Sequence, residues 1–321
     1  MREGKNVWKS LREYAIILCT VCEKTEMEGK SQPYRQDVIR YHGGMIMTYL
    51  TAVLLGLVQG ITEFLPISSS GHLVLLQNIF HIEGADLIFD VMLHVGTLFP
   101  IFLVYRRDLR RARKGLSVIG GGGAKRARGS AALKEGRRLA IFLLVGTLPL
   151  LLGLLLKGTA EKLSGSSAFI GVMLLITGGV LYAPGRFSRR EKSEKDISLL
   201  DVILVGLAQA LAVLPGLSRS GLTISAGLLR GFPKRFAVKF SFLLSVPAVI
   251  GAALISLVEA VRLGFDVGLL PMYLAGMAAA AVSGYFAIRL LRWITSRGSI
   301  GGFAYYCWGA GIVSILLSLV A

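Results

Sequence analysis

Residues 56–73 read GLVQGITEFLPISSSGHL, a stretch that sets polar side chains within strongly apolar sequence. Gln59 and Glu63 are four positions apart, so on a helix they share one face. Pro66 ends the apolar pattern, and three serines, a glycine and a histidine follow at 68–72. Ionisable groups at membrane depth are costly and usually serve function. The stretch therefore predicts the active site.

A second stretch, 150 positions later, repeats the first. With Gly56 aligned to Gly206, the identical pairs are Gly56/Gly206, Leu57/Leu207, Gln59/Gln209, Ser68/Ser218, Ser70/Ser220 and Gly71/Gly221. Leucines alone could match by chance in apolar sequence, but glutamines, serines and glycines together indicate an internal repeat.

The composition indicates a membrane protein. Hydrophobic residues form 54% of the 321 positions, and the mean hydropathy is +0.64, above that of ordinary soluble domains. Several apolar runs reach about 18 residues, enough for a helix to cross roughly 30 Å of hydrocarbon. Most of the +17 charge lies in loops, where Lys and Arg set topology and meet anionic lipid, so we expect no nucleic-acid partner.

The apolar pattern predicts an all-α polytopic membrane protein built from two repeats. Each repeat is expected to hold one re-entrant helical hairpin and three transmembrane helices, because the segment 73–80 is too short to cross. The expected hairpins cover 48–80 and 199–229, and the expected spans are 87–104, 139–156, 168–182, 240–258, 271–288 and 303–321. The repeats then occupy 45–182 and 199–321, with a basic linker at 183–198.

The basic loops predict the orientation. Residues 105–138 hold twelve Lys or Arg against two acids, and 183–198 hold five against three. Two spans separate these loops, so both lie on one side, which the positive-inside rule makes cytoplasmic. The same side receives Arg230, Lys234, Arg235, Arg289, Arg292 and Arg297. Three spans separate the hairpins, so the repeats are expected to be inverted, with the site at their interface and the first hairpin opening outward.

The first 44 residues are mixed polar and charged and lack the pattern of a signal peptide. Met45 and Met47 stand just before the first membrane segment, so we expect translation to start there and residues 1–44 to be either an artefact of the gene model or a dispensable, disordered tail. The three cysteines, Cys19, Cys22 and Cys307, predict neither a disulfide framework nor a zinc site.

If the hairpin tips meet, Arg219 faces Glu63, Ser69 and His72. A guanidinium matches phosphate oxygens with a planar fork of donors. Ser or His can serve as a nucleophile, and His also as an acid or base. Gln59 with Glu63 could hold a divalent cation through oxygen. These parts fit phosphoryl transfer.

Simpler structural roles compete with these assignments. Ser70 and Ser220 could be packing residues, and Glu63 with Arg219 could form a structural ion pair. Gln59 and Gln209 could hydrogen-bond between helices. A second polar set, Asp86, Asp90 and His94, follows helical spacing and either borders the same cavity or steadies packing.

Two motifs are similar to those of the undecaprenyl-diphosphate phosphatase, or bacitracin-resistance, family: QGITEFLPISSSGH at 59–72 and PGLSRSGLT at 215–223. The resemblance implies removal of the terminal phosphate from a C55-type polyprenyl diphosphate at the outer face of the cytoplasmic membrane, with Mg²⁺ or Ca²⁺, recycling the carrier for envelope glycan synthesis and conferring bacitracin resistance. It implies a catalytic core of Glu63, Ser69, His72 and Arg219, with Gln59, Ser68, Ser218 and Thr223 in support. We accordingly expect Ser68, Ser70, Ser218, Ser220 and Thr223 to bind substrate and Gln59 with Glu63 to bind the metal.

Some choices stay open at this point. The nucleophile is Ser69 or His72, and we favour Ser69 with His72 as acid or base. Many members carry Glu where this chain has Gln59, which weakens a tight metal site. The rival function is a lipid-phosphate transporter or flippase, but Glu63 aligns with Val213 and His72 with Leu222, so only the first hairpin carries these acid–base groups at its tip. The expected partners are membrane lipids and the lipid diphosphate, and a homodimer is left open.

Overall fold

The computed structural model of the protein describes residues 45–80, 82–83, 87–119, 131–187, 191–263 and 267–320. All of them belong to one unit, Gly43–Ala321. The extension 1–44, Asp86 and the glycine-rich middle of the basic loop lie outside the described residues, so the expectations for them stay predictions.

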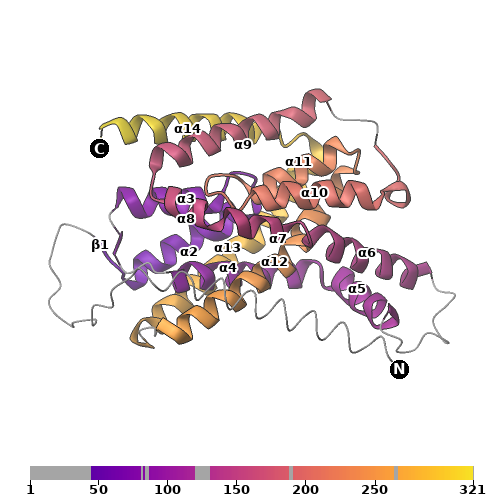
Figure 1. The fold of residues 1–321 in the computed structure, drawn as a ribbon, viewed down its shortest axis with the longest axis horizontal. Coiled ribbons are helices and arrows are strands. Elements are labelled where there is room, and N and C mark those ends of the chain that lie inside the picture. Colours follow the sequence, from indigo (N-terminus) through magenta and orange to yellow (C-terminus); the bar gives the residue numbers. More distant parts are fainter. Residues whose placement is uncertain are drawn as a thin grey trace. The chain divides into compact units, whose positions relative to one another are not determined.

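The described chain is nearly all helical (Figure 1). In chain order the elements are β1 (Met45–Ile46), α2 (Tyr49–Phe64), α3 (Ser69–Ile79), β2 (Ile82–Glu83), α4 (Leu87–Val104), α5 (Arg106–Ile119), α6 (Ala131–Thr147), α7 (Leu150–Gly153), η1 (Leu154–Leu156), α8 (Lys157–Ser164), α9 (Ser167–Phe187), η2 (Glu194–Asp196), α10 (Leu199–Leu211), α11 (Arg219–Leu229), α12 (Lys234–Leu263), η3 (Val267–Leu269), α13 (Leu270–Arg297) and α14 (Gly302–Val320). The two short strands form one parallel pair. The all-α prediction is confirmed.

Within the described residues, five helices are long and apolar enough to cross a membrane. They are Ala131–Leu156, Ser167–Phe187, Lys234–Val258, Val267–Arg297 and Gly302–Leu319. A sixth span results if the pair Ile88–Val104 and Arg106–Ser117, bent by 88°, counts as one. The chain is therefore a multi-pass membrane protein, as its composition predicts. The inverted orientation of the repeats stays a prediction.

The basic segment 105–138 differs from the loop that its charge predicts. α5 covers Arg106–Ile119 and α6 begins at Ala131, so only the middle of the segment lies outside the described helices. The charge run obscures an amphipathic pattern: Ala112 of α5 is buried, whereas Arg111 and Arg113 beside it are exposed. α5 packs against α6 through this apolar stripe.

The helix pairs of both predicted hairpins, α2 with α3 and α10 with α11, form and pack together with shifted ends, and their re-entrant course stays a prediction. α3 starts at Ser69, four residues before the expected position, because the Ser68 side chain accepts a hydrogen bond from the Gly71 N–H at 3.3 Å and caps the helix. α10 ends at Leu211, five residues early. Pro215 and Gly216 follow, and the positive φ of Gly216 (93°) turns the chain toward α11.

Close packing of α2 on α13 positions the first hairpin. A Cβ atom at Gly60 would lie 2.1 Å from Ser283 Oγ, and one at Gly56 would lie 2.2 Å from the Gly276 carbonyl oxygen. Small residues spaced four apart let two membrane helices approach this closely. Glu63 follows Gly60 by one turn, so the contact with α13 also fixes the depth of the carboxylate.

The outer helix faces suit a lipid solvent. Leu155, Leu319 and Phe187 are 80%, 77% and 73% exposed, an arrangement that apolar helices tolerate when lipid covers them. Inside, the rings of Phe232, Phe236 and Phe240 pack against one another. α9 and α14 lie side by side along one edge (Figure 1).

Candidate active site

The tips of the two hairpins meet, and the meeting point brings a carboxylate to a guanidinium. Glu63 stands in the last turn of α2, and Arg219 is the first residue of α11. A guanidinium nitrogen of Arg219 donates to Glu63 Oε1 and forms an ion pair with it. Ser220 Oγ donates to the Leu65 carbonyl oxygen at 3.3 Å, which ties the same two tips together. The predicted encounter of Arg219 with Glu63 is therefore present.

The Glu63 carboxylate is the centre of this group. It is 7% exposed, and its Oε2 atom accepts from Ser69 Oγ at 2.6 Å and from Gln59 Nε2 at 3.1 Å. The short Ser69 bond is typical of a hydroxyl bound to a charged acceptor. A serine hydroxyl held on a carboxylate has the geometry of a nucleophile with its base. Of the four predicted catalytic residues, the structure joins Glu63, Ser69 and Arg219 directly.

His72 lies beside this group but bonds elsewhere. Its Nδ1 atom is 2.7 Å from the Ser68 carbonyl oxygen, and because a carbonyl only accepts, Nδ1 carries the proton. Nε2 then accepts from the Tyr306 hydroxyl at 2.7 Å, and the two rings stack with centres 5.6 Å apart. Ser69 and His72 are three residues apart on α3 and share its face.

His94 of α4 approaches Glu63 from a third side. Its Nε2 atom is 3.8 Å from Glu63 Oε2, and its Nδ1 atom bonds the Asp90 carbonyl oxygen at 2.7 Å. Asp90 itself accepts from Gln77 Nε2 at 3.3 Å. His94 of the second polar set thus borders the site.

Hydroxyls of the second hairpin are bonded within the protein. Ser218 caps α11 by accepting from the Gly221 N–H at 3.0 Å, and its own N–H donates to Thr177 Oγ1 at 3.1 Å. Thr223 Oγ1 donates to the Arg219 carbonyl at 2.8 Å. These bonds fix the helix end that carries Arg219.

Two serines of the first hairpin stand out. Ser68 has a φ of 72°, the only positive φ of a non-glycine residue in the described ranges, and such strain gathers at functional sites. Ser70 is half-buried, and no hydrogen-bond partner for its hydroxyl lies among the described residues. It is therefore available to a ligand.

Sequence reasoning missed three contributors. Tyr306 holds His72. Ser241 accepts from Arg219 through its carbonyl at 3.4 Å and shares a 2.6 Å hydrogen bond with Thr223 through its hydroxyl. Thr177 receives the Ser218 N–H. All three come from helices distant in sequence and carry no local motif, so only the packing identifies them.

The glutamines differ in their bonding. Gln59 Oε1 is buried with no partner among the described residues, although its amide nitrogen binds Glu63. Neither polar side-chain atom of Gln209 has a partner there. The hydrogen bond between helices that was considered for both residues is therefore not seen in the described part of the chain.

The donor set limits the kind of metal site. No group of three or more His, Cys, Asp and Glu side chains that could hold a metal occurs in the described part of the chain. Glu63 already accepts from three donors, and the Oε1 atom of Gln59, one turn before it, is buried without a partner among the described residues. Two protein oxygens do not form a cage, but they fit a cation bound mainly by substrate phosphates.

The fold and the site define a class: a multi-pass membrane protein with a serine, a carboxylate and an arginine gathered between two helical hairpins. Comparison with known families is more specific. The model of the family described as bacitracin resistance protein BacA matches residues 52–313. The chain belongs to this family, as its two motifs predict.

Curated relatives align with most of the chain. A Methanosphaera stadtmanae protein is 42% identical over 279 residues, which are 86% of this chain and 100% of the relative. A Carboxydothermus hydrogenoformans protein is 40% identical over 84% of this chain and 98% of its own length. A Korarchaeum cryptofilum protein is 39% identical over 84% of this chain and 100% of its own length. All three are named undecaprenyl-diphosphatase.

Proposed function

We propose that this chain is an undecaprenyl-diphosphate phosphatase. It removes the terminal phosphate of the polyprenyl diphosphate, releases inorganic phosphate and leaves the monophosphate, which recycles the lipid carrier for envelope glycan synthesis. Since the family is described by bacitracin resistance, we propose that hydrolysis of the diphosphate also confers resistance to bacitracin. The names of the relatives support the proposal, and the convergence of Ser69, Glu63 and Arg219 is the observation that carries it.

In the first step Ser69 Oγ attacks the terminal phosphorus. A bond forms between Oγ and phosphorus while the bond from phosphorus to the bridging oxygen breaks, and the polyprenyl monophosphate departs. The Ser69 proton passes to Glu63, which already accepts it in a 2.6 Å hydrogen bond. Arg219 has five N–H donors, of which only part bind Glu63 and the Ser241 carbonyl, and the rest neutralise the phosphoryl oxygens.

In the second step water hydrolyses the phosphoserine. His72 takes the proton of the attacking water on Nε2, the atom that accepts from Tyr306 in the resting state. The bond between Ser69 Oγ and phosphorus breaks, Glu63 returns the proton to Oγ, inorganic phosphate leaves, and His72 releases its proton to solvent. Ser69 is thus the nucleophile in this proposal, Glu63 its base, and His72 the base for water.

A divalent cation, Mg²⁺ or Ca²⁺, is part of the proposal. Gln59 Oε1 and Glu63 would hold it together with the diphosphate oxygens, and it would supply further neutralisation of phosphate charge. Ser68, Ser70, Ser218, Ser220 and Thr223 line the two tips and are proposed to position the substrate phosphates. Of these, the free hydroxyl of Ser70 has the clearest capacity for a direct bond.

We place the protein in the cytoplasmic membrane with the site open to the outer face. Basic residues at the start of α12 (Arg235, Lys239) and near the end of α13 (Arg289, Arg292) line one cavity, and the positive-inside rule assigns this end of the helices to the cytoplasm. A lipid-phosphate transporter remains the rival. The Ser69–Glu63 bond favours hydrolysis, because a carrier needs no nucleophile on a base.

The test is phosphate release from C55 polyprenyl diphosphate by the purified protein in detergent. Ser69→Ala is compared with Ser117→Ala, a serine on α5 that donates only to the Lys114 carbonyl. We expect release by the native protein and by Ser117→Ala, loss in Ser69→Ala, and loss on chelation that Mg²⁺ or Ca²⁺ reverses. Release by a folded Ser69→Ala protein contradicts the nucleophile. A folded native protein without release directs attention to lipid transport in vesicles.

A further inference from the structure

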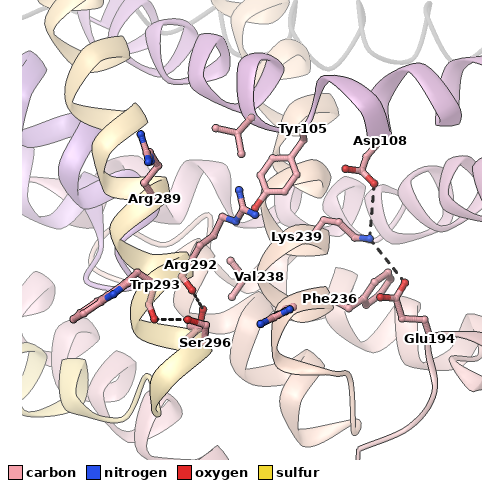
Figure 2. A pocket seen from close by; sticks show the side chains of 13 residues that line it. Tyr105, Asp108, Glu194, Phe236, Val238, Lys239, Arg289, Arg292, Trp293 and Ser296 are labelled. Carbon is pink, nitrogen blue, oxygen red and sulfur yellow. Dashed lines mark hydrogen bonds and ion pairs between the residues drawn. The ribbon is translucent and has the colours of Figure 1, made fainter.

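A cavity of about 650 Å³ opens where α5, α12 and α13 come together (Figure 2). Tyr105 reaches it from the bend between α4 and α5, Arg235 and Lys239 from the first turns of α12, and Arg289 and Arg292 from the last turns of α13. We call this cavity the basic pocket.

The basic pocket is separate from the active site. Neither Glu63 nor Arg219 lines it. The Phe242 ring lies between the basic pocket and the active site. Its centre is 6.3 Å from the centre of the Tyr105 ring on the pocket wall. It is 5.2 Å from the centre of the Phe64 ring, and Phe64 follows Glu63 in the chain. A ligand in the basic pocket would therefore not contact the catalytic group.

The charge of the pocket is only partly neutralised. Its two acids, Asp108 and Glu194, both pair with Lys239 at 3.8 Å (Figure 2). No carboxylate partner for Arg235, Arg289 or Arg292 is found among the residues that the structure describes. Three guanidinium groups thus remain for an anion, each with several donors in a planar fork.

The pocket arginines are not consumed by the protein's own carbonyls. Arg292 lies over the Tyr105 ring, 5.8 Å from its centre, a contact that leaves its N–H groups free. Arg138 nearby shows the opposite arrangement, because it donates to the Glu194 and Ile197 carbonyl oxygens at 2.6 Å each. Arg138 is therefore structural, whereas Arg292 is available.

Two aromatic residues of the pocket wall, Tyr105 and Trp293, complement the arginines with a neutral hydrogen-bond donor and an apolar surface. Tyr105 is 5% exposed, and no partner of its hydroxyl lies in the described ranges. Burial raises the pKa of Tyr105 to about 12, so the phenol stays protonated and can donate. Trp293, another lining residue, is 53% exposed, as is usual for an aromatic residue at the membrane interface.

We propose that the basic pocket binds a phosphate group, held by Arg235, Arg292 and the Tyr105 hydroxyl. The guanidinium forks and the phenol match the oxygens of a phosphate or phosphate monoester. That chemistry has two sources: free inorganic phosphate, and the head group of an anionic phospholipid in the adjacent leaflet. The inference is independent of the proposed phosphatase activity, because it rests on other residues.

The first arm of the test is calorimetric titration of inorganic phosphate into detergent-purified protein. All proteins carry Arg219→Ala, which removes the guanidinium of the active site. We compare Arg235→Ala/Arg292→Ala with Arg113→Ala, an exposed arginine of α5 that does not line the pocket. We expect the double variant to raise Kd at least tenfold and Arg113→Ala to leave it unchanged.

The second arm is native mass spectrometry of the same proteins from nanodiscs that contain phosphatidic acid and phosphatidylcholine. Retention of phosphatidic acid that the double variant abolishes identifies the lipid head group. Phosphate binding without retained phosphatidic acid identifies free phosphate. The proposal is overturned if neither ligand binds, if the double variant binds as the parent does, or if Arg113→Ala weakens binding equally. If the unfolding midpoint of the double variant falls, Arg235→Ala alone serves, since this exposed side chain supports no described contact.

Discussion

Replacement of Glu63 by Gln is expected to lower the turnover rate far more than the stability of the fold. The carboxylate has donors on both oxygens: Arg219 on Oε1, and Ser69 and Gln59 on Oε2. A Gln side chain keeps the shape but turns one acceptor into a donor, which would face the Gln59 amide nitrogen. Gln59 can turn its amide over, because its Oε1 atom has no described partner to lose.

The remaining cost of Glu63→Gln comes from Arg219, which loses its counter-charge. A hydrogen bond to a charged group contributes about 1.5–3 kcal/mol. Breaking a fully buried ion pair costs about 3–5 kcal/mol, but the Arg219 side chain is 17% exposed and keeps the Ser241 carbonyl. We therefore expect a loss of about 1.5–3 kcal/mol in the free energy of unfolding and a protein that still folds.

The effect on turnover is expected to be larger. A positioned general base contributes roughly 10²–10⁴ in rate, equivalent to about 2.7–5.5 kcal/mol of activation free energy. The assay is steady-state phosphate release in detergent, with thermal unfolding of the same sample. Glu63→Gln should lower kcat at least a hundredfold. A folded Glu63→Gln protein with kcat within about tenfold of the native value would refute Glu63 as the base that accepts the Ser69 proton.

Three further substitutions test other parts of the structure. Arg219→Lys should lower kcat/KM about a hundredfold with little change in the unfolding midpoint, because an ammonium cannot form the fork; near-normal phosphate release would argue against phosphate binding by Arg219. Tyr306→Phe removes the donor to His72 Nε2, a bond of about 0.5–1.5 kcal/mol, and should lower kcat about two- to tenfold; an unchanged kcat would show that this contact does not orient the imidazole. Gly60→Ala places a methyl group 2.1 Å from Ser283 Oγ and should lower the unfolding midpoint in detergent, whereas Gly158→Ala, with nothing within 4 Å, should not; equal midpoints would contradict the close packing of α2 on α13.

The site consists of two kinds of parts. Each hairpin tip is organised locally, since Ser68 and Ser218 cap the short helices that follow them. The bonds that join Glu63 to Arg219 and His72 to Tyr306 run between helices far apart in the chain. Damage to a cap should therefore disturb one tip, whereas damage to helix packing should separate the tips from each other.

Sequence by itself determined the class of the protein and most of its helices. Apolar length predicts α4 at its observed bounds, Leu87–Val104, because a helix in hydrocarbon needs only its own residues to satisfy its backbone. The two motifs also predict the pairing of Glu63 with Arg219, since a repeat places equivalent tips at one interface. Charge alone predicts a loop over 105–138, but Arg106–Ile119 form the helix α5. The helix depends on burial of its apolar stripe against α6.

Only the tertiary structure decided which polar groups bond. Tyr306 meets His72 across 234 residues, and His94 approaches Glu63 from another helix. No local pattern encodes such contacts, because they depend on how closely the helices pack. Gly60 is the clearest example. In the sequence it is an ordinary small residue within an apolar run. In the structure the absence of its side chain lets α2 pack closely on α13, which determines the position of Glu63.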